Sequence, residues 1–117
     1  MSLMNYWKIS STALMLLISI GAHAEQISGR ELLAACNDSK GPAAKQYCVG
    51  YITAAIETHA TWALWRRLER VFCFPEGDKF EHAFGGVVEY LRAHPEQLDF
   101  EASSLVLTSI NERFACE

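Results

Sequence analysis

Four cysteines are the residues of this chain best suited to chemistry, and their spacing narrows what that chemistry can be. Cys36, Cys48, Cys73 and Cys116 follow one another at intervals of 12, 25 and 43 residues, so the sequence has no C-x-x-C pair. Zinc sites and thioredoxin-type redox sites commonly use such pairs, and both are therefore disfavoured. Four cysteines in a short chain predict two disulfides instead, provided that the chain is exported, as its first 24 residues indicate.

The pairing of the cysteines depends on the run between Cys48 and Cys73. An unbroken helix over residues 48–70 would place these two cysteines on the order of 35 Å apart, at about 1.5 Å per residue. Disulfides need Cα atoms within about 7 Å, so these two do not pair with each other. If the third helix runs back along the second and the fourth runs parallel to the second, Cys116 reaches the end of the bundle where Cys73 lies. Cys36 and Cys48 then lie together at the other end, so Cys36–Cys48 with Cys73–Cys116 is favoured. The scheme Cys36–Cys73 with Cys48–Cys116 stays open.

The first 24 residues have the order of a secretory signal peptide. Lys8 precedes an apolar stretch from Ala13 to Ile20, and the small-residue tripeptide Ala22-His23-Ala24 follows. The apolar stretch is well short of the roughly 20 residues that span a bilayer, which favours a cleaved signal over a membrane anchor. We expect cleavage after Ala24 and an exported mature domain, residues 25–117, without a membrane segment.

The charge of the chain argues against nucleic acid as a partner. The full sequence has 10 basic and 14 acidic residues and a net charge of -4. Cleavage would remove Lys8 alone, leaving 9 basic and 14 acidic residues, which lowers the net charge to -5. Phosphate binding needs a concentration of Lys and Arg that such a chain lacks. The mature chain is long enough for one domain, which two disulfides would help to stabilise.

Hydrophobic spacing predicts an all-α fold, a small bundle of about four helices held by the two disulfides. Ser28 and Glu31 form a capping-box pattern at the start of the first helix. The second helix is expected over residues 43–70, because apolar residues recur there at intervals of three and four and no proline interrupts them. No segment alternates for long enough to predict a strand.

Two further helices are predicted after a break at Pro75 and Gly77. Asp78 and Glu81 form a second capping-box pattern, and the helix that follows is expected to run to about residue 93. The fourth helix is expected to begin with Asp99 as its cap. Its predicted inward residues are Ala102, Leu105, Val106, Ile110 and Phe114.

The sequence contains no recognisable motif for catalysis or metal binding. The histidines of the mature chain, His59, His82 and His94, lack the four-residue spacing of a helical zinc site. Gly85-Gly86 does not belong to a phosphate-binding loop, and the serines of the predicted fourth helix lack the pattern of a nucleophile elbow. We therefore expect a protein without enzymatic activity, cofactor or metal.

The least ordinary stretch is THATWALWRRLERVF, whose residues 62–70 we call the Trp–Arg segment. Core packing is the plainer interpretation of Trp62 and Trp65, but both cannot easily share the apolar face of the helix, so one is expected to be exposed. Arg66, Arg67 and Arg70 would lie on the last turns, where cations suit the helix dipole. Trp and Arg are also enriched at interface hot spots, which makes the segment the predicted partner-binding surface.

Five short pieces stand in order along the chain: ELLAACN at 31–37, CVGYI at 48–52, CFPEG at 73–77, VVEYLRAHPE at 87–96 and FAC at 114–116. Together they resemble the Rap/Tai family of small exported immunity proteins. Such proteins neutralise peptidoglycan-degrading effectors of the type VI secretion system. Two departures are visible: Thr53-Ala54 stand where a further glycine is common, and Ala115 where a proline is common. The Trp–Arg segment matches no family motif.

The resemblance implies an all-helical periplasmic domain that inhibits a cognate peptidoglycan amidase by binding it. Proteins of this family often form homodimers and have no catalysis of their own. The alternative is a small disulfide-bonded acid chaperone of the periplasm, which is also helical. A chaperone would bind many clients at low pH, whereas an immunity protein binds one partner.

Overall fold

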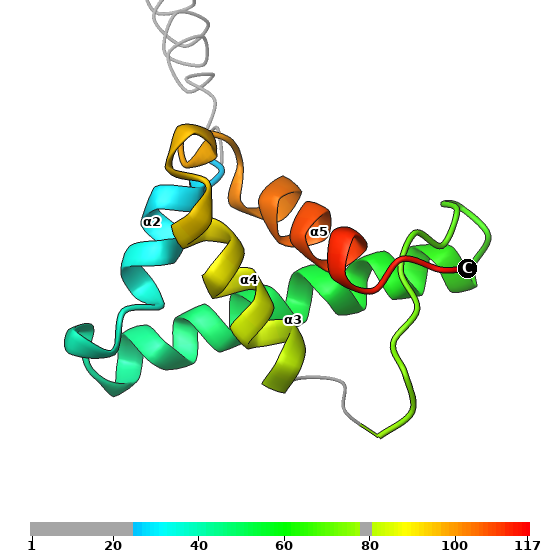
Figure 1. Cartoon of the computed structure of the whole chain (residues 1–117), viewed down its shortest axis with the longest axis horizontal. Coiled ribbons are helices and arrows are strands. Elements are labelled where there is room, and N and C mark those ends of the chain that lie inside the picture. Colours follow the sequence, from blue (N-terminus) through cyan, green and yellow to red (C-terminus); the bar gives the residue numbers. More distant parts are fainter. Residues whose placement is uncertain (1–24, 78–80) are drawn as a thin grey trace, which may run out of the picture.

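Four α-helices make up most of the chain that the structure, a computed structural model, describes: residues 25–77 and 81–117 (Figure 1). The predicted signal peptide and the predicted cap Asp78 lie outside these residues. Within them there is no β-strand and no helix apolar and long enough to cross a bilayer, and the all-α prediction is confirmed. The elements are α2 (Gly29–Ala35), η2 (Asp38–Lys40), α3 (Pro42–Leu64), α4 (Glu81–Ala93), η3 (Pro95–Gln97) and α5 (Ala102–Arg113).

The start of α2 has the predicted capping box. The Ser28 side chain accepts a hydrogen bond from the Glu31 backbone N–H (3.2 Å), and the Glu31 carboxylate accepts one from the Ser28 backbone N–H (2.7 Å). Two backbone donors that the first helical turn would otherwise leave unpaired are satisfied in this way. Helix α2 therefore begins at the residue that its sequence indicates.

Helix α3 ends at Leu64, and the prediction that it continues to residue 70 is wrong. The helix is closed by a Schellman motif, in which Arg66 occupies the left-handed position with φ 55°. Glycine is the usual residue at this position, and because arginine occupies it here, the sequence lacks the usual signal for the end of a helix. The motif's hydrogen bonds run from the Arg66 N–H to the Ala63 carbonyl (3.0 Å) and from the Arg67 N–H to the Trp62 carbonyl (2.9 Å).

The predicted cap of the last helix is also wrong. Helix α5 begins after Glu101, and Asp99 instead forms an ion pair with Arg30 of α2 (3.0 Å). The chain turns through η3 before α5 begins, which places Asp99 beside α2 and not at the helix end. Phe114, predicted on the inward face of the helix, lies just beyond its end and packs against Phe74, with ring centroids 4.8 Å apart.

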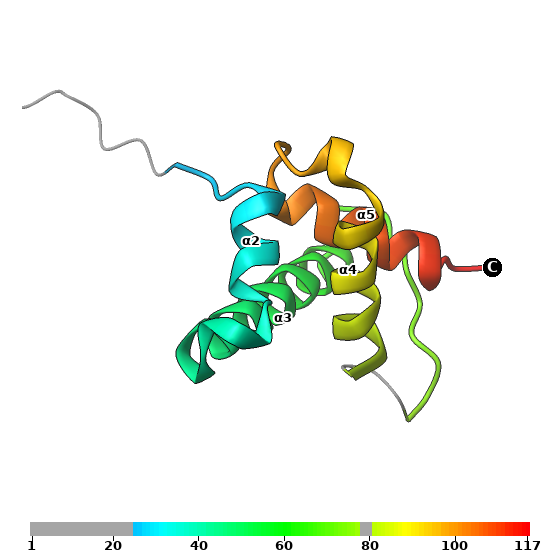
Figure 2. The ribbon, with the colours of Figure 1, turned by 60° about the vertical axis from the view of Figure 1, so that its left-hand side comes forward.

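Both disulfides have the favoured pairing, but the helical arrangement used to argue for it is not observed. Cα atoms are 5.1 Å apart in Cys36–Cys48 and 5.0 Å apart in Cys73–Cys116. Helix α4 crosses α3 and does not run back along it (Figures 1 and 2). A long connection after α3 replaces the expected turn, so nothing requires α4 to lie along its predecessor.

The second disulfide forms because residues 70–74, here called the return segment, lie beside the end of α5. The Cys73 N–H donates to the Phe114 carbonyl (2.7 Å), and Phe72 forms an isolated antiparallel bridge with Ala115. Phe72 itself is buried. The return segment is thus anchored by backbone contacts and a buried ring as well as by the disulfide.

The core lies where α2, α4 and α5 pack on the first two thirds of α3. From α3 it takes Cys48, Ile52 and Ile56, and no residue of α3 after Ile56 is buried. The last two turns of α3 therefore extend past the core. The largest fully buried side chains from the other helices are Leu32, Val87, Leu91, Val106 and Ile110.

Gly29 allows α2 and α5 to approach closely at their starts. Its N–H donates to the Phe100 carbonyl (2.9 Å), and a Cβ at this position would meet the Leu105 side chain and lie 3.4 Å from the Leu98 backbone. The Leu98 backbone is at an ordinary contact distance, so the steric conflict is with Leu105, whose side chain is buried in the core and must shift to make room for a Cβ.

We predict that Gly29→Ala lowers the free energy of unfolding by about 1–3 kcal/mol through overpacking. Gly50 is the matched control, since it lies within α3 and its Cβ would have no neighbour within 4 Å beyond the adjoining helix backbone. Gly50→Ala should stabilise the protein by up to about 1 kcal/mol, because glycine in a helix interior costs that much. Urea unfolding of the oxidised protein measures both. Equal effects of the two substitutions would contradict the close approach.

Acid should weaken the α2 capping box. Hydrogen bonds from the Ser28 N–H and then from its hydroxyl lower the pKa of Glu31 below its ordinary value of 4.5. A pKa lowered by folding contributes stability that is present above the unfolded-state pKa and is lost as pH falls through the folded-state value. We predict that the unfolding free energy falls below about pH 4.5 and that Glu31→Gln removes part of this fall.

Urea unfolding at several values between about pH 3 and 6 measures the effect. Glu57→Gln is the control, since Glu57 is exposed and forms no side-chain hydrogen bond with the described residues. An acid slope for Glu31→Gln equal to that of the unsubstituted protein would contradict the prediction.

Candidate partner-binding site

The Trp–Arg segment begins on the part of α3 that extends past the core. Trp62 lies on the last turn and Trp65 caps the helix. Their rings meet edge to face, with centroids 5.7 Å apart and an interplanar angle of 74°. Trp62 is 44% and Trp65 62% exposed, so core packing does not account for either ring. Both tryptophans are therefore on the surface, where the sequence predicted one.

Other apolar side chains continue this surface along the chain. Leu64 is 72% exposed, and Leu68 and Val71 are exposed as well. Single exposed apolar residues are ordinary on a protein surface. Five large ones within ten consecutive residues are a concentration of the kind that marks an interaction site.

The three arginines follow α3 and do not lie on its last turns. The last turn of α3 contains no basic residue, so the expected placement of the arginines is wrong, because the helix ends before them. Arg66, Arg67 and Arg70 are all exposed, and none forms an ion pair with another residue in the described ranges. Glu69 is the acidic residue among them, so the segment carries a local positive charge on a chain of net charge -4.

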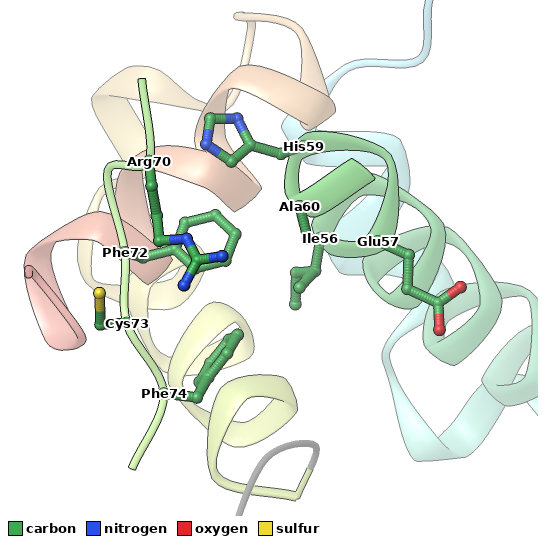
Figure 3. A pocket seen from close by; sticks show the side chains of 8 residues that line it. All are labelled: Ile56, Glu57, His59, Ala60, Arg70, Phe72, Cys73 and Phe74. Carbon is green, nitrogen blue, oxygen red and sulfur yellow. The ribbon is translucent and has the colours of Figure 1, made fainter. Parts of the chain in front are cut away.

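A hollow of ≈ 300 Å³ lies between α3 and the return segment (Figure 3). Ile56 and Ala60 of α3 face Phe72 and Phe74 across it, while the Glu57 carboxylate points away from the return segment. The aromatic side chains give this hollow an apolar wall. They also connect it to the disulfide, because Cys73 lies between the two phenylalanines in the sequence.

A second hollow, which we call the α3/α5 groove, has a volume of ≈ 380 Å³. Thr58, His59 and Ser103 bring polar groups into an otherwise mainly apolar lining, and Tyr51 adds a phenolic hydroxyl to its aromatic ring. Since Trp62 and Leu68 belong both to this lining and to the Trp–Arg segment, the groove continues the exposed apolar surface. Its apolar lining is Tyr51, Ala54, Ala55, Trp62, Leu68 and Leu107.

His59 separates the two hollows and contributes to both. Its ring packs on Phe72, with centroids 4.9 Å apart. The Nε2 atom is buried and has no hydrogen-bond partner among the described residues. The contact with Phe72 makes His59 part of the packing that holds the return segment on α3.

Neither a free thiol nor a cluster of metal ligands is found among the described residues. All four cysteines are in disulfides, and no group of three or more His, Cys, Asp or Glu side chains could hold a metal ion within residues 25–77 and 81–117. The close pair His94 and Glu96 (3.1 Å) is exposed. The chemistry that this surface supports is recognition, through aromatic, aliphatic and guanidinium groups.

Sequence analysis missed the residues that complete the site. Phe72 and Phe74 come from a segment that it treated as a break, although the spacing F-x-F is typical of an extended chain with one apolar face. Leu107 falls outside the predicted inward set of the last helix, and an apolar residue out of phase indicates a second, surface contact. The F-x-F spacing and the out-of-phase leucine are visible in the sequence, but they do not indicate which helices these residues contact.

Comparison with known families decides what kind of protein carries this surface. The family model of Rap1a immunity proteins matches residues 28–116, from the capping box of α2 to the last cysteine. The chain belongs to this family. The resemblance noted in the sequence is thereby confirmed, and membership implies that the chain is a type VI effector immunity protein, which binds a cognate effector. No curated protein and no solved structure matches the chain.

In this Rap1a family member, we predict unequal roles for the two disulfides. Cys73–Cys116 closes 43 residues and Cys36–Cys48 closes 12, which by loop entropy corresponds to about 4 and about 3 kcal/mol. Replacing Cys73 and Cys116 together by serine should lower the unfolding free energy by the larger amount and alter tryptophan fluorescence, because the return segment supports the exposed end of α3. The pair Cys36 and Cys48 is the control for fluorescence. A loss below about 1 kcal/mol in the Cys73/Cys116 variant would contradict the anchoring role.

Proposed function

We propose that the chain is a periplasmic immunity protein that binds a type VI secretion effector with peptidoglycan amidase activity and inhibits it by occlusion. The observation that carries the proposal is the family match over residues 28–116, which covers nearly the whole exported domain. The immunity role follows from membership. The proposal goes beyond membership in two respects: the protein acts in the periplasm, and its target is an amidase.

Two features of the chain support a periplasmic location. The first 24 residues have the pattern of a secretory signal, with cleavage expected after Ala24. Two disulfides are characteristic of an oxidising compartment, since the cytosol keeps thiols reduced. Peptidoglycan lies in that same compartment, so an inhibitor there meets a cell-wall amidase where it acts.

The Trp–Arg segment is the proposed contact surface. Trp62 and Trp65 supply exposed aromatic area, and the guanidinium groups of Arg66, Arg67 and Arg70 are available for carboxylates of a partner. Buried aromatic anchors and desolvated arginines provide much of the binding energy in many protein interfaces. An inhibitor that covers an active site needs no reactive group of its own, so a catalytic constellation is not required. A homodimer of the chain would present this surface twice.

We predict that the oxidised mature protein, residues 25–117, captures one peptidoglycan amidase from periplasmic extract of its host at neutral pH. Purified, that amidase should lose its hydrolysis of isolated cell wall in proportion to added protein, with little activity left at one copy per enzyme. Trp65→Ala should weaken the inhibition by about tenfold or more, as expected at a hot spot. Mass spectrometry identifies the captured protein, and release of soluble cell-wall fragments measures inhibition.

Phe100→Ala is the matched control, because Phe100 is a comparably exposed aromatic residue on the turn before α5. Capture of many unrelated proteins at acidic pH alone would contradict the proposal and identify an acid chaperone. A captured amidase that remains fully active would show binding without immunity. Sedimentation of the mature protein alone determines whether it is a homodimer.

A further inference from the structure

We propose that the α3/α5 groove receives one apolar side chain that projects from an acidic surface of the partner protein, while Arg66, Arg67 and Arg70 pair with carboxylates around it. The proposal rests on the proposed function for the identity of the partner as an amidase effector. It adds where the partner inserts and what chemistry its contact surface must have.

The size and lining of the groove favour an apolar side chain as its occupant. A volume of ≈ 380 Å³ is more than ten times the ~30 Å³ of a liquid water molecule, which is enough for an aromatic or branched aliphatic side chain. Tyr51, Ala55, Trp62 and Leu107 provide apolar walls. An apolar group placed there is removed from water and covers side chains that are now partly exposed.

The charge of the surroundings favours an acidic partner surface. The three arginines follow the groove residue Trp62 along the chain. Arg67 directly precedes Leu68, which also lines the groove, and Arg70 lines the neighbouring hollow (Figure 3). Their guanidinium groups have no ion-pair partner within the described part of the chain. A partner that brings carboxylates to this part of the surface would satisfy them, and burial on binding would strengthen these charge-assisted hydrogen bonds.

The backbone at Arg66 points to the same role. Arg66 is the one non-glycine residue with positive φ in the described ranges, at a position where glycine would adopt the left-handed conformation without steric cost. A side chain kept there at the expense of stability suggests a function for that side chain. The Schellman turn ends α3 at this point, so the exposed Arg66 lies directly after the helix, between the groove residues Trp62 and Leu68 in the sequence.

A protein fits these observations better than a cell-wall polymer does. Sugar polymers are recognised through many hydroxyl contacts, and the groove offers Thr58, Ser103 and His59 beside a mainly apolar lining. Exposed tryptophan together with arginine is the composition of protein interface hot spots. Binding to isolated peptidoglycan is therefore an outcome that the test must be able to detect.

The test measures affinity for the protein that the unsubstituted mature chain captures from periplasmic extract. Ala54→Trp should fill the groove from its exposed edge and weaken binding by about tenfold or more. Ala43→Trp, at the exposed start of α3, is the matched control and should bind within about twofold of the unsubstituted protein. Circular dichroism confirms that both variants keep their helices.

The charge component is tested at Arg66. Arg66→Glu should weaken binding by about tenfold and make it less sensitive to salt, whereas Arg92→Glu, an exposed arginine on α4, should do neither. Arg66→Gly gives the sharpest result, because it should unfold at a higher temperature than the unsubstituted protein and yet bind more weakly. A purely structural role of Arg66 would not separate stability from binding in this way.

Several outcomes would overturn the proposal. Normal binding by Ala54→Trp would exclude the groove while leaving the immunity function intact, if the captured protein is an inhibited amidase. A change in oligomeric state caused by Ala54→Trp would assign the groove to a second copy of this chain. Co-sedimentation with isolated peptidoglycan that is lost in Arg66→Glu would assign it to the cell wall. If the captured protein is not an amidase but the variants behave as predicted, the proposed function fails and the groove stands; capture of no protein overturns both.

Discussion

The attachment of the return segment to α3 and α5 is the constraint on which the rest of the candidate site depends. A chain of aromatic contacts runs from His59 of α3 through Phe72 and Phe74 to Phe114 at the end of α5, with centroid separations of 4.9, 5.3 and 4.8 Å. Cys73 lies within this chain and forms the covalent link to Cys116. The last turns of α3 have no buried residue of their own, and His59 is the residue through which they contact the return segment in this chain of rings.

The other end of the molecule is held by different means. Cys36–Cys48 joins the end of α2 to α3, and Gly29 lets α2 lie directly against α5. The buried residues of α3 are confined to this half. A small domain of this length cannot bury a large core, and here the core is concentrated at one end while the other carries exposed tryptophan, leucine and arginine. The core therefore lies at one end of the molecule and the candidate partner-binding surface at the other.

Features of the fold that depend on local sequence patterns could be predicted, whereas features that depend on residues far apart in the sequence could not. Ser28 with Glu31 marked the start of α2, and the spacing of Leu105, Val106 and Ile110 marked the buried face of α5, because both are local patterns. The end of α3 was misplaced because Arg66 takes a conformation usually reserved for glycine. Asp99 was misassigned because its partner, Arg30, is 69 residues away in the sequence.

By itself, the sequence determined the helical class, the two disulfides as a chemical framework, the resemblance to immunity proteins and the segment rich in tryptophan and arginine. These depend on residue type and on spacing within a few turns of helix. The tertiary structure decided that both tryptophans are exposed, that the arginines lie beyond the helix and that a groove opens between α3 and α5. Such features arise where segments distant in sequence meet. Burial of apolar surface, ring contacts and a disulfide hold these segments together, and a local sequence pattern does not show which segments will meet.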